Sequence, residues 1–122
     1  MEASKIVKLP KVISIAASAA VLTACQPQTM YHWGSYENMV YKMYRSPKDA
    51  TPEKQIEILQ KEASVAASRH RELPPGFRAH LGFLFAQVGQ SDAARTQFEE
   101  EKAHFPESAA FMDHLLGKMT RK

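Results

Sequence analysis

The chain has 122 residues, of which 44% are hydrophobic and 24% are charged. This composition is typical of one globular domain and leaves no room for a large multidomain enzyme. The formal charge is +3, and about two of these charges fall within the first 24 residues, so the near-neutral remainder argues against nucleic acid as the main partner. The single cysteine, Cys25, excludes an intrachain disulfide and a cysteine-built zinc site.

Residues 1–24 have the pattern of an export signal. Three lysines precede residue 12, and the uncharged run VISIAASAAVLTA follows at residues 12–24, which is the order of a basic n-region and an apolar h-region. As a helix, this run would span only about 20 Å, which is less than the ~30 Å hydrocarbon core of a bilayer. We therefore expect a cleaved signal peptide and not a permanent transmembrane helix.

The h-region ends in Leu22-Thr23-Ala24-Cys25, which resembles the lipobox of bacterial lipoproteins. The resemblance implies cleavage between Ala24 and Cys25, followed by acylation of the Cys25 thiol and of the new amine. Two or three acyl chains hold a protein stably on a membrane. The alternative is a buried, inert cysteine behind an ordinary leader. By resemblance to sorting in Gram-negative lipoproteins, Gln26 after the cysteine implies an outer-membrane protein that faces the periplasm.

Residues 25–32 are predicted to form the lipidated N-terminus and a short tether of at most about 25 Å, and residues 33–122 the domain. We expect Trp33 to be the first core residue; the alternative places Trp33 and Tyr31 at a membrane interface. The first helix is predicted over roughly residues 34–45. Its apolar stripe consists of Tyr36, Met39, Val40, Met43 and Tyr44.

The second helix is predicted to begin at Thr51-Pro52-Glu53, which supplies an N-cap hydroxyl, a proline at N1 and an acid in the first turn. It runs to about Arg71, and its stripe changes from large residues to the small Ala63, Ala66 and Ala67, which predicts close approach of a neighbouring helix. Pro74-Pro75-Gly76 then breaks the chain.

The third helix, at about residues 76–88, is apolar on two faces. Its main face consists of Phe77, Leu81, Leu84, Phe85 and Val88, and its second face of Ala79, Phe83 and Ala86. Such a helix lies between neighbours, or one face awaits a partner. A fourth helix is predicted from Ser91 to about residue 105, and a fifth from near Glu107 to Met119 with Phe111, Leu115 and Met119 inside. No segment alternates with period two, so the predicted fold class is all-α with about five helices.

Residues 75–108 resemble a tetratricopeptide repeat. The matching residues are Leu81, Gly82, Phe85, Gly89, Ala94, Phe98 and Pro106, whereas Arg78 stands where the repeat has tryptophan. The small Gly82 and Ala94 are predicted to lie where two helices cross closely; the alternative is a generic helical hairpin. The resemblance implies antiparallel helix pairs stacked as a short array. It also implies a partner-binding groove lined by Ala79, Phe83, Ala86 and Gln87. The simpler expectation for Phe83 is packing against the preceding helix.

The segments Tyr31–Tyr36 and Val40–Pro47 resemble a family of short proteobacterial lipoproteins that is catalogued as a domain of unknown function. The resemblance extends over residues 22–122. It implies that the gene lies beside one for a lipoprotein similar to the curli secretion channel, which would make that protein a candidate partner. The family brings no assigned activity or catalytic residue.

The sequence contains none of the common catalytic or ligand-binding motifs. The five histidines lack metal-ligand spacing, and no nucleophile elbow or phosphate loop occurs. Glu99–Lys102 is expected to be a solvated helix face, and Arg69, Arg71 and Arg78 to be solvated or ion-paired. We therefore expect no enzyme activity, cofactor, metal, small-molecule substrate or nucleic acid. The predicted function is a lipid-anchored interaction module, an accessory or scaffold lipoprotein of an outer-membrane or secretion-related assembly. The alternative is a structural envelope lipoprotein that binds peptidoglycan or lipid.

Overall fold

The computed structural model describes residues 29–120. Within this range five α-helices follow one another: α2 (Tyr36–Arg45), α3 (Pro52–Ser68), α4 (Phe77–Gln87), α5 (Ser91–His104) and α6 (Ala109–Met119), with a 3-10 turn at Pro106–Ser108. No strand occurs within residues 29–120, and the predicted all-α fold of about five helices is confirmed. The predicted signal peptide, its cleavage site at Ala24 and the lipidation site at Cys25 lie outside the described residues.

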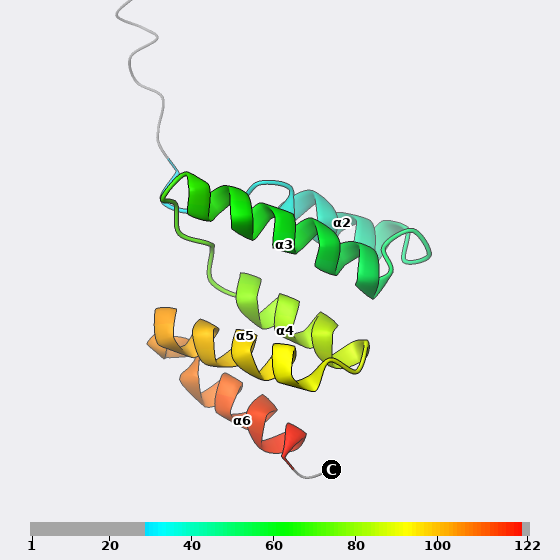
Figure 1. Cartoon of the computed structure of the whole chain (residues 1–122). Helices are drawn as coiled ribbons and strands as arrows, with labels where there is room; N and C mark the ends of the chain where they lie inside the picture. Colours follow the sequence, from blue (N-terminus) through cyan, green and yellow to red (C-terminus); the bar gives the residue numbers. More distant parts are fainter. Residues whose placement is uncertain (1–28, 121–122) are drawn as a thin grey trace, which may run out of the picture.

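The helices stack in layers (Figure 1). Helices α2 and α3 form one antiparallel pair, α4 and α5 form the next, and α6 packs on α5 at the far end of the stack. Because each helix reverses the direction of the one before it, α2 and α4 run in the same direction (Figure 1). The first helices of the two pairs therefore lie on one side of the stack, and the second helices, α3 and α5, on the other.

The hydrophobic core runs through every layer. The hydrophobic residues that are most deeply buried are Leu59, Ala66, Phe77, Leu84, Ala94, Phe98 and Met112. On α4 the predicted main face is confirmed, since Phe77, Leu81, Leu84 and Phe85 are all buried. On α6 the prediction was wrong for Phe111, which is 61% exposed, because α6 turns Met112 and Leu116 inward instead. Phe111 and Leu115 form one apolar row along α6, and Met112 and Leu116 form a second row one residue further on. Packing against α5 determines which row is buried.

Helices α4 and α5 cross closely at Gly82. A Cβ atom at this position would lie 2.7 Å from the ring of Phe98 and 3.1 Å from the carbonyl oxygen of Ala94. Ala94 itself is completely buried. Only a residue without a side chain fits here, and the predicted close crossing of Gly82 and Ala94 is confirmed.

Candidate binding surfaces

A shallow apolar hollow of about 440 Å³ opens along the outer side of α2. The residues that line it are Trp33, Tyr36, Glu37, Val40, Tyr41 and Tyr44. The prediction that Trp33 is the first core residue was wrong, because its indole is exposed and leans on the Tyr36 ring at a centroid distance of 6.4 Å. The assignment of Tyr44 to the buried stripe was also wrong, since its side chain is 79% exposed.

Tyr36 is partly buried and packs against the core, next to the fully buried Met39 of the same helix. Its ring lies 5.2 Å from the ring of Phe77 and 5.8 Å from that of His80, measured between centroids. Burial and, to a smaller extent, the negative charge of Glu101 raise the pKa of the Tyr36 phenol. Burial lowers the pKa of His80. Both side chains are therefore held neutral where α2 meets α4.

The second face of α4 continues this aromatic surface. Phe83 lies about one turn beyond His80 on α4, and Val40 and Tyr44 lie one and two turns beyond Tyr36 on α2. Tyr36 contacts His80, and α2 and α4 run in the same direction (Figure 1), so these residues extend the same way from that contact. We call Trp33, Tyr36, Val40, Tyr41, Tyr44 and Phe83 the aromatic face.

The structure separates the four residues of the predicted groove. Phe83 is 52% exposed, so the expectation that it packs against the preceding helix was wrong. Ala86 and Gln87 are exposed as well, whereas Ala79 packs against the core. The contacts of α4 with α3 and α5 are already made by its main face, which leaves Phe83 on the opposite side. Sequence reasoning missed the contribution of α2, although Tyr41, which lies outside the predicted stripe, was a visible signal.

A buried carboxylate connects α5 to the beginning of α4. Glu101 is only 1% exposed, so the expectation of a solvated face at residues 99–102 was wrong for this residue. Its Oε1 accepts a hydrogen bond from the Gly76 amide at 2.6 Å, and its Oε2 accepts one from the Ala79 amide at 3.3 Å. The N-terminus of a helix carries unpaired amides and a partial positive charge. The Glu101 carboxylate, which comes from α5, accepts hydrogen bonds from two of these amides and places a negative charge next to the positive end of α4.

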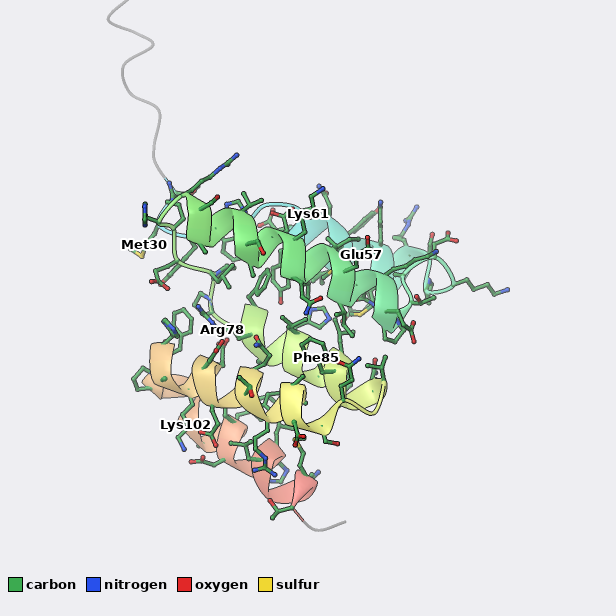
Figure 2. All side chains as sticks on the ribbon, in the orientation of Figure 1. Met30, Glu57, Lys61, Arg78, Phe85 and Lys102 are labelled. Atoms are coloured by element: carbon green, nitrogen blue, oxygen red, sulfur yellow. The ribbon has the colours of Figure 1, made fainter. Side chains whose placement is uncertain are left out.

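The neighbours of Glu101 make ion pairs. The Arg78 Nε atom lies 3.7 Å from Glu100 Oε2, which agrees with the expectation that Arg78 is ion-paired. Lys102 Nζ lies 2.6 Å from Asp113 Oδ1, and this hydrogen bond raises the pKa of Lys102. The side chains of Arg78 and Phe85 lie in the opening between α3 and α5 (Figure 2). Ala63 lines this opening of about 550 Å³ instead of bringing a helix close, which corrects the prediction for Ala63, whereas Ala66 is buried in the core.

The segment before α2 is fixed to α3 by Glu62. One carboxylate oxygen accepts hydrogen bonds from the amide and the hydroxyl of Ser35, at 3.2 and 2.7 Å, and the other lies 2.9 Å from His32 Nε2. The bonds from Ser35 and His32 lower the pKa of Glu62. Gly34 adopts a φ of +49°, and a Cβ there would overlap the same carboxylate. The turn at Gly34 therefore requires glycine for two reasons.

A second set of bonds holds the segment at the end of α3. The His32 amide donates to the Glu72 carbonyl at 2.7 Å, and Tyr31 pairs with Glu72 as an isolated β-bridge. The Arg71 guanidinium donates to the carbonyl oxygens of Thr29 and Tyr31. Residues 29–35 are thus part of the folded domain.

Residues 29–120 lack two further features. Within this range, no helix has the length and apolar character needed to cross a bilayer. In the same range, the side chains that ligate metals do not gather in groups of three or more.

These observations define an all-α protein of stacked helix pairs with a continuous hydrophobic core and exposed aromatic residues on α2 and α4. The family model described as "Domain of unknown function (DUF4810)" matches residues 30–115, and the chain belongs to this family. The match covers α2 to α5 and most of α6. No curated protein and no solved structure matches the chain.

Proposed function

We propose that the protein is a lipid-anchored interaction module that faces the periplasm and binds a protein partner through its aromatic face. In this role it is an accessory or scaffold lipoprotein of an outer-membrane or secretion-related assembly. The observation that carries the proposal is the exposure of Phe83, Tyr41 and Tyr44 on the side formed by α2 and α4. The fold already has a complete core, so these large side chains do not stabilise it by burial.

The chemistry of the aromatic face supports a protein partner. Aromatic side chains are enriched in protein interfaces and commonly dominate their energetics. The hollow on α2 has an apolar lining with a single carboxylate, that of Glu37. An apolar side chain of a partner would fill it and bring the partner against Phe83 of α4.

The arrangement of the helix pairs supports a tetratricopeptide-like interpretation. The close crossing at Gly82 and Ala94 is the contact for which that repeat uses small residues, and Phe98 lies directly against it. In such arrays the first helices of the pairs line the binding groove, and here these are α2 and α4 (Figure 1). Ala86 and Gln87 extend this surface along α4.

The anchor is proposed from the sequence. The apolar run at residues 12–24 ends at Cys25, and acyl chains on that residue would hold the domain at the membrane without a transmembrane helix. A lipoprotein similar to the curli secretion channel is the partner that the family resemblance suggests. Protein binding and anchoring are separate parts of the proposal, and they are tested separately.

The partner is tested with a photocrosslinking amino acid placed at Tyr44 or Phe83 of the lipidated protein in native membranes. The matched control carries the same amino acid at Phe111 on α6, whose 61% exposure lies between the 52% of Phe83 and the 79% of Tyr44. We expect one crosslinked protein from positions 44 and 83, recovered in a fixed ratio, and none from position 111. Equal crosslinking from all three positions, or crosslinks only to peptidoglycan or lipid, would contradict the proposed protein partner.

The anchor is tested by metabolic labelling with a fatty acid that carries an alkyne. The wild-type protein should incorporate the label, whereas Cys25→Ser should remain an unlabelled precursor of higher mass. A mature, soluble Cys25→Ser protein of normal length would show that Cys25 is not the anchor.

A further inference from the structure

The outer side of α3 carries a stripe of basic and apolar residues. These are Lys54, Ile58, Lys61, Val65 and Arg69, which recur at intervals of three and four residues and therefore lie on one side of the helix. The centre of the stripe lies about 120° around α3 from the buried Leu59. Figure 2 shows Lys61 pointing away from α4, with Glu57 on the side turned toward the viewer. Ile58 is 40% exposed although it belongs to the middle of a packed helix.

Basic residues of α2 border this stripe. Lys42 and Arg45 lie about 120° and 180° around α2 from Tyr36, which contacts α4. They therefore point to the outer side of the first layer, and both are exposed. We call the α3 stripe together with Lys42 and Arg45 the basic outer face.

Charge is distributed unevenly between the layers. Residues 30–71 contain seven lysines and arginines against five acidic residues, whereas residues 72–120 contain four against seven. Within residues 29–120, both ion pairs that involve lysine or arginine belong to the second group, at Arg78 and Lys102. No cation of the basic outer face is paired with a carboxylate in that same range. The positive charge of this face therefore remains available to an anionic surface.

The position of Thr29 on the domain indicates that this anionic surface is a membrane. Thr29 is held by Arg71, directly after the end of α3, so the preceding residues join the domain at the layer that carries the basic outer face. Only three residues separate Thr29 from Cys25, and they reach about 15 Å at most. A membrane that holds Cys25 would therefore lie within reach of α2 and α3.

From these observations we propose that the basic outer face rests on an anionic membrane surface. Lipid phosphates contact Lys42, Arg45, Lys54, Lys61 and Arg69, and the side chains of Ile58 and Val65 enter the interface between the headgroups. The inference rests on the proposed anchor at Cys25, and it adds an orientation. The aromatic face then points sideways from the membrane, where a neighbouring membrane-bound protein can reach it.

The test uses the full lipidated protein in vesicles of phosphatidylcholine alone or with phosphatidylglycerol added. An environment-sensitive dye on Ile58→Cys reports contact with lipid, and the same dye on Phe111→Cys is the matched control on α6. Quenching by acrylamide, which is uncharged, should fall for position 58 only in the vesicles that contain phosphatidylglycerol. The protection should disappear at high salt, because added ions screen charged surfaces.

Charge variants identify the residues responsible. Each basic residue close to an anionic surface favours the docked state by a factor of roughly five. Lys54→Glu with Lys61→Glu should therefore lower the ratio of docked to undocked protein by at least about 25-fold. Arg95→Glu with Lys118→Glu changes the net charge equally in the second half of the chain and should have little effect.

Flotation with the vesicles separates the two proposals. Flotation with both vesicle types, without protection of position 58, would overturn the docking surface and leave the anchor intact. Flotation only with phosphatidylglycerol would support the docking surface and contradict the anchor. Equal effects of the two double variants would overturn the docking surface, because the response would then follow net charge alone.

Discussion

The buried carboxylate of Glu101 allows a quantitative test of how the helix pairs are held together. Placing a carboxylate in the interior is costly unless hydrogen bonds compensate for the lost water. Here the compensation comes from two amides at the start of α4, at 2.6 and 3.3 Å. Glu101→Ala would remove both bonds and leave the amides of Gly76 and Ala79 without their acceptor.

The expected loss can be estimated from comparable cases. A hydrogen bond to a charged group contributes about 1.5 to 3 kcal/mol, and removal of a helix N-cap costs about 0.5 to 2 kcal/mol. We expect Glu101→Ala to lower the free energy of unfolding by about 3 kcal/mol. For a domain of this size, that corresponds to a decrease in Tm of roughly 12 to 24 °C.

Two variants sharpen the comparison. Glu101→Gln keeps one acceptor oxygen but turns an N–H₂ group toward the Ala79 amide, so its cost should be intermediate, at about 1 to 2 kcal/mol. Glu99→Ala removes an exposed carboxylate from the same helix and should stay within about 0.5 kcal/mol. Urea unfolding followed by circular dichroism measures all three. A loss for Glu101→Ala no larger than that for Glu99→Ala would refute the assignment of Glu101 as the cap of α4.

Three further substitutions address the crossing, the aromatic face and the N-terminal segment. Gly82→Ala should destabilise the protein by about 1 to 2 kcal/mol, because overpacking against Phe98 exceeds the gain in helix propensity. Gly117→Ala places its methyl group in open space and should stabilise the protein by up to ~1 kcal/mol. Thermal unfolding measures both changes. Phe83→Ala should change the free energy of unfolding by less than about 1 kcal/mol and weaken partner binding, whereas Phe77→Ala should cost about 3 to 5 kcal/mol. The lowered pKa of Glu62 means that its contribution to stability is present above its unfolded pKa and is lost as the pH falls through its folded pKa. Glu62→Gln should therefore flatten the acid side of the curve of stability against pH, and an unchanged curve would contradict the role of Glu62.

The sequence predicts those parts of the fold that depend on local pattern. The start of α3 at Thr51 and Pro52 and the main face of α4 follow from residues close together in the chain. The crossing at Gly82 was predictable because two short residues occur at a spacing that brings them together in a helical hairpin. In each case the information lies within about one turn or one hairpin.

The errors arise where distant elements decide between equivalent local choices. Glu101 stands in a run of acids that is indistinguishable from a solvated face, and only the position of the α4 N-terminus makes it a cap. On α6, Phe111 and Met112 offer adjacent apolar registers, and contact with α5 selects the second. Trp33 is the largest apolar side chain near α2, but the turn at Gly34 gives the place in the core to Tyr36.

The fixed N-terminal segment links the two proposals mechanically. If residues 29–32 were free, an anchor at Cys25 would let the domain rotate and present any side to the membrane. Because Arg71, Glu72 and Glu62 bind these residues to α3 and to the segment that follows it, only three residues separate Cys25 from the part of the chain that is held in place. A shorter connection raises the effective concentration of the basic outer face at the lipid surface. In the proposed arrangement, weak contacts between individual lysines and lipid phosphates are then sufficient to orient the domain. The aromatic face points sideways, where a neighbouring membrane-bound protein can reach it.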